Sequence, residues 1–195
     1  MLTLCIDTAY KYLTCALIKD NEILSSMSFP CFKKQSEELF ETLKQVFVKT
    51  NYSPREIDSI CISEGPGSYT GVRIAMSLAK TIGETLPCDV YTISTLRLYA
   101  AGNPSTMVIM NARADRAYVG VYNNNEVIMD DTIIEVSKIN TMSYNVVGDG
   151  MLVNKFDKYP NIAEAFLKTK PVWNKVDRIA YLVPKYLKES ESYYR

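Results

Sequence analysis

The chain has 195 residues, of which 47% are hydrophobic and 23% are charged, the composition of an ordinary globular protein. Its 22 basic and 22 acidic residues give a formal net charge of zero, which argues against a large basic surface dedicated to nucleic acid. The sequence contains no histidine. This excludes a Ser-His-Asp triad, a Cys-His pair, a histidine-ligated zinc and HExxH metallopeptidase chemistry.

The start of the chain, MLTLCIDTAYKY, lacks the basic lead and long apolar core of a signal peptide. No apolar run approaches the roughly 20 residues that span a bilayer. We therefore expect a cytoplasmic protein whose cysteines are reduced. The five cysteines form no CxxC pair, and four of them fall within or beside strand-like runs: Cys5, Cys15, Cys61 and Cys88, with Cys31 as the fifth.

The first part of the chain predicts three strands followed by a helix. Short apolar runs at 2–6, 12–18 and 22–29 are typical of strands, and the polar segment 19–21 suits a hairpin turn. From Ser36 the pattern changes to helical spacing, with Ser36 as the expected N-cap. The apolar residues on one face of this helix are Leu39, Phe40, Leu43, Val46 and Phe47.

A second set of elements completes a compact α/β lobe. Ser53-Pro54-Arg55-Glu56 has the form of a capping box and opens a single helical turn that leads into a strand at 58–63. A helix is expected over 70–86, with Thr70 as its cap, because Pro87 stops it. A strand at 88–92 and a helix at 94–101 follow. The order βββαβα predicts a first lobe over residues 1–103.

The segment Gly102-Asn103-Pro104 is the expected boundary with a second, reduced lobe over 104–174. Strands are predicted there at 106–110, 116–122, 126–129 and 145–147, followed by a helical stretch that ends before Pro171. A final helix is predicted over 175–187, as part of a C-terminal helical region, 175–195, that packs back on the first lobe. The sequence thus predicts an α/β protein with two lobes.

The glycine-rich stretch SEGPGSYTG, residues 63–71, lies between a predicted strand and a predicted helix. A helix N-terminus suits a phosphate, but the stretch lacks the lysine of a Walker A motif, and its third glycine falls one residue too late for GxGxxG. The competing interpretation is a tight turn shaped by Pro66 and the glycines, and it is favoured. Candidate nucleotide or cleft residues are Asp7, Thr8, Gly65 and Gly67.

A polar cluster, Asn111-Ala112-Arg113-Ala114-Asp115-Arg116, separates two predicted strands of the second lobe. Its side chains have the chemistry to contact a ligand across a cleft. A solvated hairpin turn that carries opposite charges accounts for the same pattern, and we favour that interpretation.

The helix after the glycine-rich stretch carries small residues every four positions: Gly71, Ala75, Ala79 and Gly83. Such a stripe lets another backbone approach closely, either the sheet of its own lobe or a partner. Apolar residues occupy nearly every other side of the helix, at Val72, Ile74, Met76, Leu78 and Ile82. A helix that is apolar all round must be covered on more than one side, so one cover is expected to be a partner protein.

The run SEGPGSYTGVRIAMSLAKTIGETL resembles the hallmark of the bacterial TsaB (YeaZ) family, usually written GPGSFTGLRIG…AKGLA. Further similar segments extend over most of the chain: LCIDTA, QSEELF, ISTLRLYA, NARADRAYVGVY and PKYLKE. The chain departs from the family pattern at Gln35, where histidine is common, at Asn111, where aspartate is common, and at Tyr69, where phenylalanine is common. These departures further weaken the case for independent catalysis.

The resemblance implies a two-lobed actin-like ATPase (ASKHA, ribonuclease-H-like) fold and a role in forming N6-threonylcarbamoyladenosine beside the anticodon of tRNA. It implies a non-catalytic partner of a TsaD-like paralogue, with a TsaE-like ATPase joining them and tRNA reached only through the complex. No cofactor, metal or membrane is implied. The pairing surface, used also for self-association, is expected to include Gly71, Val72, Ala75, Met76, Ala79, Ile82, Gly83, Leu39 and Leu43.

Two alternatives stay open at this point. One is a stand-alone ASKHA phosphotransferase or ATPase, with a metal at Asp7 and phosphate near the glycine-rich stretch. The other is a peptidase, because relatives have been labelled glycoproteases, but the missing histidines make that class improbable.

Overall fold

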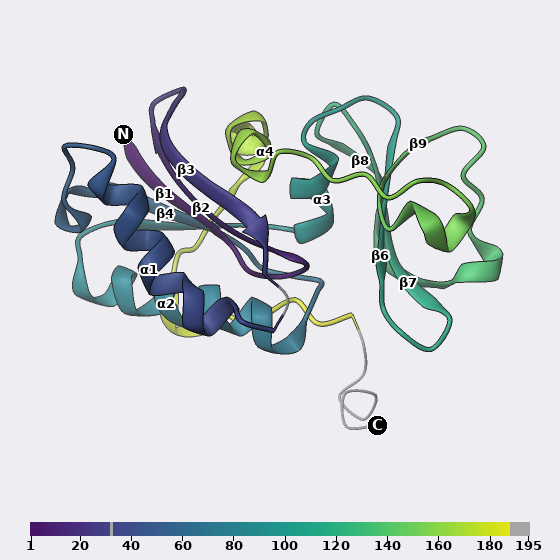
Figure 1. The fold of residues 1–195 in the computed structure, drawn as a ribbon, viewed down its shortest axis with the longest axis horizontal. Helices are drawn as coiled ribbons and strands as arrows, with labels where there is room; N and C mark the ends of the chain where they lie inside the picture. Colours follow the sequence, from purple (N-terminus) through teal and green to yellow (C-terminus); the bar gives the residue numbers. More distant parts are fainter. Residues whose placement is uncertain (32, 188–195) are drawn as a thin grey trace.

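The computed structural model describes residues 1–31 and 33–187 and contains two β-sheets (Figure 1). The first sheet has six strands in the order β10-β5-β4-β1-β2-β3. Their bounds are β1 Leu2–Asp7, β2 Tyr12–Lys19, β3 Glu22–Pro30, β4 Ser59–Ser63, β5 Asp89–Ile93 and β10 Asn174–Lys175. The predicted βββαβα order is confirmed, with β1, β4 and β5 parallel and β2 and β3 antiparallel.

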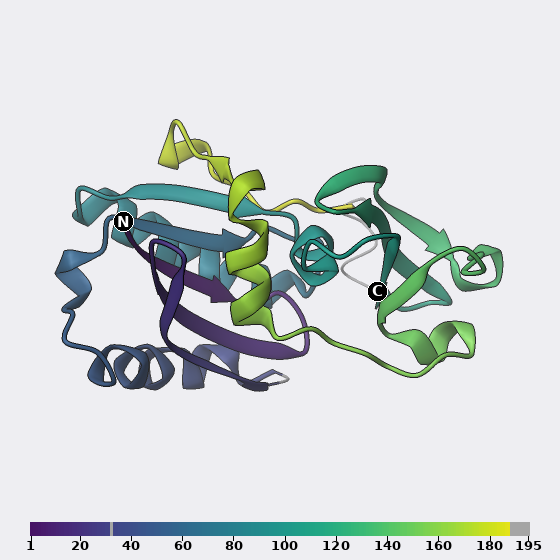
Figure 2. The ribbon, with the colours of Figure 1, turned by 90° about the horizontal axis from the view of Figure 1, so that it is seen from above.

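Helices cover both faces of this sheet, which explains why every residue of β1 and β4 is buried. Helices α1 (Gln35–Val48) and α2 (Tyr69–Thr85) lie side by side on one face, where they contact β2 and β4 (Figure 1). Helix α4 (Ile162–Thr169) packs on β2 and β3 from the other face (Figure 2). The helical stretch predicted before Pro171 is therefore present, on the sheet of the first lobe.

The second sheet has four strands in the order β8-β7-β6-β9. Their bounds are β6 Thr106–Asn111, β7 Arg116–Asn123, β8 Glu126–Glu135 and β9 Asn145–Gly148. Helix α3 (Thr95–Ala100) lies between the two sheets (Figure 2), and one apolar cluster includes residues of the first sheet, α3, α4 and the second sheet. The lobes therefore share a core, and the boundary at residue 103 stays a prediction.

Two predicted helix caps are wrong and one is confirmed. Helix α1 begins at Gln35 with Lys34 at the N-cap position and no side-chain cap, so Ser36 lies inside the helix. Helix α2 is capped by Ser68, which accepts from the Gly71 N–H, and not by Thr70. The capping box at Ser53 is present and opens a single 3₁₀ turn, Pro54–Glu56.

The prediction of a final helix over 175–187 is wrong. Residues Asn174–Lys175 instead form β10, Ile179–Tyr181 form one 3₁₀ turn, and 182–187 have no regular secondary structure. Pro184 explains part of the error, because proline removes an N–H and disfavours helix in the residue before it. Residues 188–195 of the predicted C-terminal helical region lie outside the described residues.

Across the ranges 1–31 and 33–187, no helix combines the length and the apolar character that crossing a membrane requires.

The glycine-rich turn is pressed against the end of β1. Thr8 Oγ1 donates to the Gly71 backbone oxygen at 2.6 Å, and the Ser68 N–H donates to the Ala9 oxygen at 2.7 Å. A Cβ added at Gly71 would lie 2.2 Å from the Thr8 oxygen, and one at Gly67 would lie 2.3 Å from the Ala9 oxygen. The small residues at the start of α2 therefore admit the backbone of β1.

We expect Gly71→Ala to lower the free energy of unfolding by about 3 kcal/mol, because the added methyl group meets backbone that cannot move without displacing α2. Urea unfolding monitored by circular dichroism measures the change. Gly83→Ala is the matched control in the same helix. Its Cβ would approach only the ends of the Ile179 and Val90 side chains, at 2.6 and 2.7 Å. Because alanine also favours helix by about 1 kcal/mol, the control should be nearly neutral. Equal losses in the two variants would contradict this account of the stripe.

Candidate functional site

The candidate metal ligand Asp7 is fully buried at the end of β1. Its Oδ1 accepts from Ser63 Oγ at 2.5 Å and from the Ala9 N–H at 3.0 Å, and its Oδ2 accepts from the Tyr99 hydroxyl at 3.0 Å. Burial raises the pKa of the Asp7 carboxyl above its ordinary value, and these hydrogen bonds oppose the rise. Both carboxylate oxygens thus have partners within the protein. Among the residues that the structure describes, no three His, Cys, Asp or Glu side chains gather as a metal site.

The other candidate cleft residues, Thr8, Gly65 and Gly67, lie beside Asp7 but present little to a phosphate. Thr8 is fully buried and bonded to Gly71, as described above. Gly65 has φ 104°, a left-handed value that favours glycine, and its N–H donates to Thr95 Oγ1 at 3.1 Å. A Cβ at Gly65 would lie 2.7 Å from the backbone oxygen of Lys185. The turn therefore shapes and packs the backbone, as the favoured interpretation predicted.

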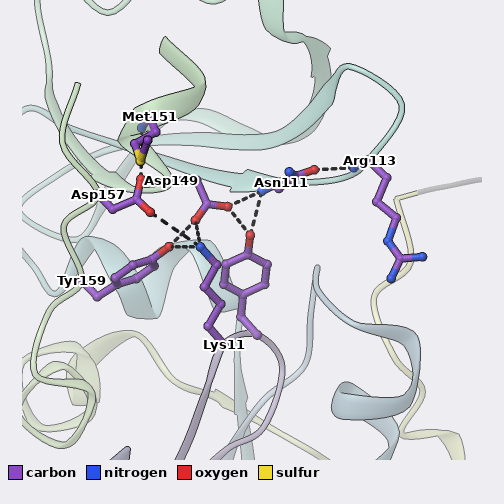
Figure 3. A network of polar contacts seen from close by, with 8 residues as sticks. Lys11, Asn111, Arg113, Asp149, Met151, Asp157 and Tyr159 are labelled. Carbon is purple, nitrogen blue, oxygen red and sulfur yellow. Dashed lines mark hydrogen bonds and ion pairs between the residues drawn. The ribbon is translucent and has the colours of Figure 1, made fainter. Parts of the chain in front are cut away.

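A polar network joins the turn between β1 and β2 to the second lobe (Figure 3). At its centre, the Asp149 carboxylate accepts from Lys11 Nζ at 2.6 Å and from the Asn111 N–H at 2.8 Å. The hydroxyls of Tyr10 and Tyr159 also donate to it. Lys11 Nζ further donates to the Tyr159 hydroxyl at 2.8 Å. The network spans the two lobes with one buried carboxylate.

The network holds Asp149 ionised. Burial alone would raise the pKa of its carboxyl, but hydrogen bonds from Lys11, Tyr10, Tyr159 and the Asn111 N–H outweigh burial and lower that pKa. The pKa values of Tyr10 and Tyr159 are raised, first by burial and then by their hydrogen bonds to Asp149. Both hydroxyls therefore stay protonated as donors, and the arrangement suits a structural junction better than proton transfer.

The predicted polar cluster at 111–116 contributes to this junction through its backbone. The Asn111 N–H donates to Asp149, and Asn111 Oδ1 accepts from the Arg113 N–H at 2.7 Å, which closes a turn. Arg113, Ala114 and Asp115 all have left-handed φ values of 50–64°. The hairpin interpretation is therefore confirmed. The sequence analysis assigned no role to Asp149, which lies between two glycines just after a predicted strand.

A second network closes the cleft near α3. The carboxylate of Asp131, on β8, accepts from Ser94 Oγ at 2.6 Å and from the Tyr122 hydroxyl, and it lies 3.1 Å from Lys185 Nζ. Its side chain is only 2% exposed. Burial raises the pKa of Tyr122, and the charge of Asp131 adds to the rise. Like Asp149, Asp131 is satisfied by groups of this chain.

Most residues predicted for the partner surface are buried or half-buried within their own lobe, and their part in pairing stays a prediction. The buried members are Gly71, Val72, Ala75, Met76, Ala79 and Leu39, and the half-buried members are Leu43, Ile82 and Gly83. The small-residue stripe faces the sheet, and at Gly71 the backbone of Thr8 approaches too closely for any side chain. The outward face of α2 carries Arg73, Ser77 and Thr81, with half-buried Ile74 and Leu78 beside them.

Two lobes built on separate sheets, joined through α3 and closed by buried carboxylate networks, define an α/β protein of the two-lobed actin-like ATPase (ASKHA) class. Residues 31–163 match the family described as TsaD: tRNA N6-adenosine threonylcarbamoyltransferase. Because the match covers more than half of the chain, the protein belongs to this family, in its TsaB (YeaZ) branch.

Curated relatives and solved structures agree with this assignment. A "tRNA threonylcarbamoyladenosine biosynthesis protein TsaB" of Buchnera aphidicola (Schizaphis graminum) is 25% identical over 75% of this chain and 78% of its own length. The Bacillus subtilis protein of the same name is 27% identical over 68% of this chain but only 60% of its own length. The structure of YeaZ from Pseudomonas aeruginosa superposes with a TM-score of 0.79 at 18% identity, covering 95% of this chain and 99% of that one. At that identity the superposition establishes the fold.

We expect Asp149→Asn to lower the free energy of unfolding by about 2 kcal/mol near pH 7, because hydrogen bonds to a charged group are lost. The pKa of Asp149 is lowered by folding, so its contribution is present above the unfolded pKa, about 4, and is lost as pH falls through the folded value. The difference between wild type and variant should therefore shrink on acidification. Urea midpoints measured between about pH 3 and pH 7 test this.

Asp7→Asn is the matched variant, for which the stability difference from wild type should change with pH in the opposite direction. The pKa of Asp7 is raised by folding, so its contribution is present below the unfolded pKa and is lost as pH rises through the folded value. The stability of wild type relative to this variant should fall with rising pH. Parallel pH profiles for Asp7→Asn and Asp149→Asn would contradict the two assignments.

Proposed function

We propose that this protein is a non-catalytic subunit required, with a TsaD-like paralogue and a TsaE-like ATPase, for forming N6-threonylcarbamoyladenosine in tRNA. Family membership and the names of its TsaB relatives support the pathway. The observation that supports the non-catalytic role is the burial of Asp7. Asp7, which an ASKHA phosphotransferase would need at a metal, is fully buried and bonded to Ser63, Ala9 and Tyr99. The proposal places the protein in the cytoplasm, with tRNA reached through the complex.

The outward faces of α1 and α2 are the proposed docking surface for the paralogue. They expose apolar side chains on adjacent helices, including Phe40 at 69%, Val48 at 75% and Tyr69 at 39% exposure. Isolated exposed apolar residues are ordinary on proteins, but exposed apolar residues carried by two contacting helices suit a partner. Half-buried Leu78 lies on the same outward side of α2. In the absence of the paralogue, the same surface would serve self-association.

Substitution on this outward face should separate docking from folding. We expect Ser77→Arg to weaken binding to the TsaD-like paralogue by about tenfold or more, since a long charged side chain then enters the proposed docking surface. The unfolding midpoint should stay unchanged, because Ser77 is exposed. Affinity is measured by calorimetry, and tRNA modification is followed in a reconstituted reaction with and without this chain.

Ser137→Arg is the matched control, an exposed serine changed in the same way on the second lobe. It should bind and support modification like wild type. Unaltered binding by Ser77→Arg would refute α2 as the docking helix. Modification at full rate without this chain, or ATP turnover by this chain alone, would refute the non-catalytic role.

A further inference from the structure

The C-terminal segment follows a path along the first lobe and then across to the second. Strand β10 pairs with β5, and the Val176 N–H donates to the Val90 oxygen at 2.9 Å. Ile179 then packs against Gly83 of α2, and Leu182 is buried in the first core cluster. From there, residues 182–187 cross toward the second lobe (Figure 2). We call this stretch, 182–187, the strap.

Lys185 fastens the strap to both lobes at once. Its N–H donates to the Glu64 backbone oxygen at 2.7 Å, beside the glycine-rich turn of the first lobe. Its Nζ lies 3.1 Å from Asp131 Oδ2 on β8 of the second lobe. The Asp131 side chain is 2% exposed, whereas that of Lys185 is 42% exposed. A buried carboxylate is costly without a cation, so this ion pair stabilises the position of the strap against the second lobe.

Tyr186 adds a third contact. Its ring stacks on Tyr69, the first residue of α2, with centroids 5.2 Å apart and planes at 19°. Arg73 donates to the Tyr69 hydroxyl at 2.6 Å. The strap therefore touches the glycine-rich turn, the second lobe and the start of α2 within two consecutive residues.

Lys185 of the strap also lines a polar cavity between the lobes. This cavity, of about 110 Å³, is lined by both lobes and by Lys185, and its wall includes Glu64, Ser94, Arg97, Tyr122 and Asp131. Arg97 Nε is buried there without a hydrogen-bond partner. The strap forms no strand or helix of its own. It is held by the apolar side chains of Leu182 and Leu187 and by the contacts of Lys185 and Tyr186, so it can detach without breaking a sheet ladder or a helix.

We propose that residues 182–187 are a closure strap, which locks the second lobe against the glycine-rich turn and lines the cavity beside Asp131. Detachment removes the cation from Asp131 and uncovers Glu64. It withdraws Leu187 from the edge of the shared core but leaves α3 and the Asp149 network in place. The strap acts within the isolated chain, and this inference does not depend on the proposed function.

Hydrogen–deuterium exchange of the isolated full chain tests the strap. Lys185→Met keeps the aliphatic stem and removes the cation. We expect amides of 64–71 and 126–135 to exchange about threefold or more faster in this variant, because both segments lose their tie to the strap. Exchange in β1 and β4 should stay as in wild type.

Lys175→Met is the matched control, because Lys175 forms an ion pair of 2.7 Å with Asp89 within the first lobe. It should leave exchange in 64–71 and 126–135 unchanged. In an Asp131→Asn background, Lys185→Met should add little, since the two residues act through one contact. Exchange in Lys185→Met that matches the control would overturn the strap. An increase spread over β1 and β4 would overturn it as well, because it would reflect general destabilisation.

Discussion

The architecture depends on one backbone contact, the approach of the glycine-rich turn to the end of β1. Gly67 and Gly71 lie against the oxygens of Ala9 and Thr8 so closely that no side chain fits between them. This contact sets α2 on the sheet and brings the turn over Asp7. The Asp7 carboxylate is fully buried beside this contact, and its hydrogen-bond partners are groups of the protein. A phosphate cradle and a close backbone junction need the same small residues, and here the junction uses them.

The remaining polar groups of the cleft follow the same principle. Asp149 and Asp131 are buried acids that would be costly alone, and each is satisfied by groups from both lobes. Lys11 reaches Asp149 from the first lobe, and Ser94 reaches Asp131 from the loop before α3. Charge thus holds the two lobes together through groups of this chain. This use of charge is why we propose a docking subunit.

The sequence predicted elements whose signals are local. Nearby residues indicate the βββαβα order of elements along the chain, the capping box at Ser53 and the helix after the glycine-rich turn. Long-range pairing was out of reach: Lys11 and Asp149 are 138 positions apart, and Asp7 and Tyr99 are 92 apart. The side of α2 that meets the sheet was ambiguous, because an all-round apolar helix gives no phase. Pro184 was a local signal against the helix predicted over 175–187.

The position of α4 and β10 on the first sheet has a consequence for biosynthesis. Both elements come after the second sheet in the chain. Helix α4 nevertheless covers β2 and β3, and strand β10 extends the first sheet beyond β5. The first 103 residues therefore emerge from the ribosome with one apolar face of their sheet bare. The first lobe is completed only after residues 162–187 have been made. The second sheet is thus in effect an insertion into the first lobe, and the first lobe cannot be completed until the segment that follows this insertion has been made.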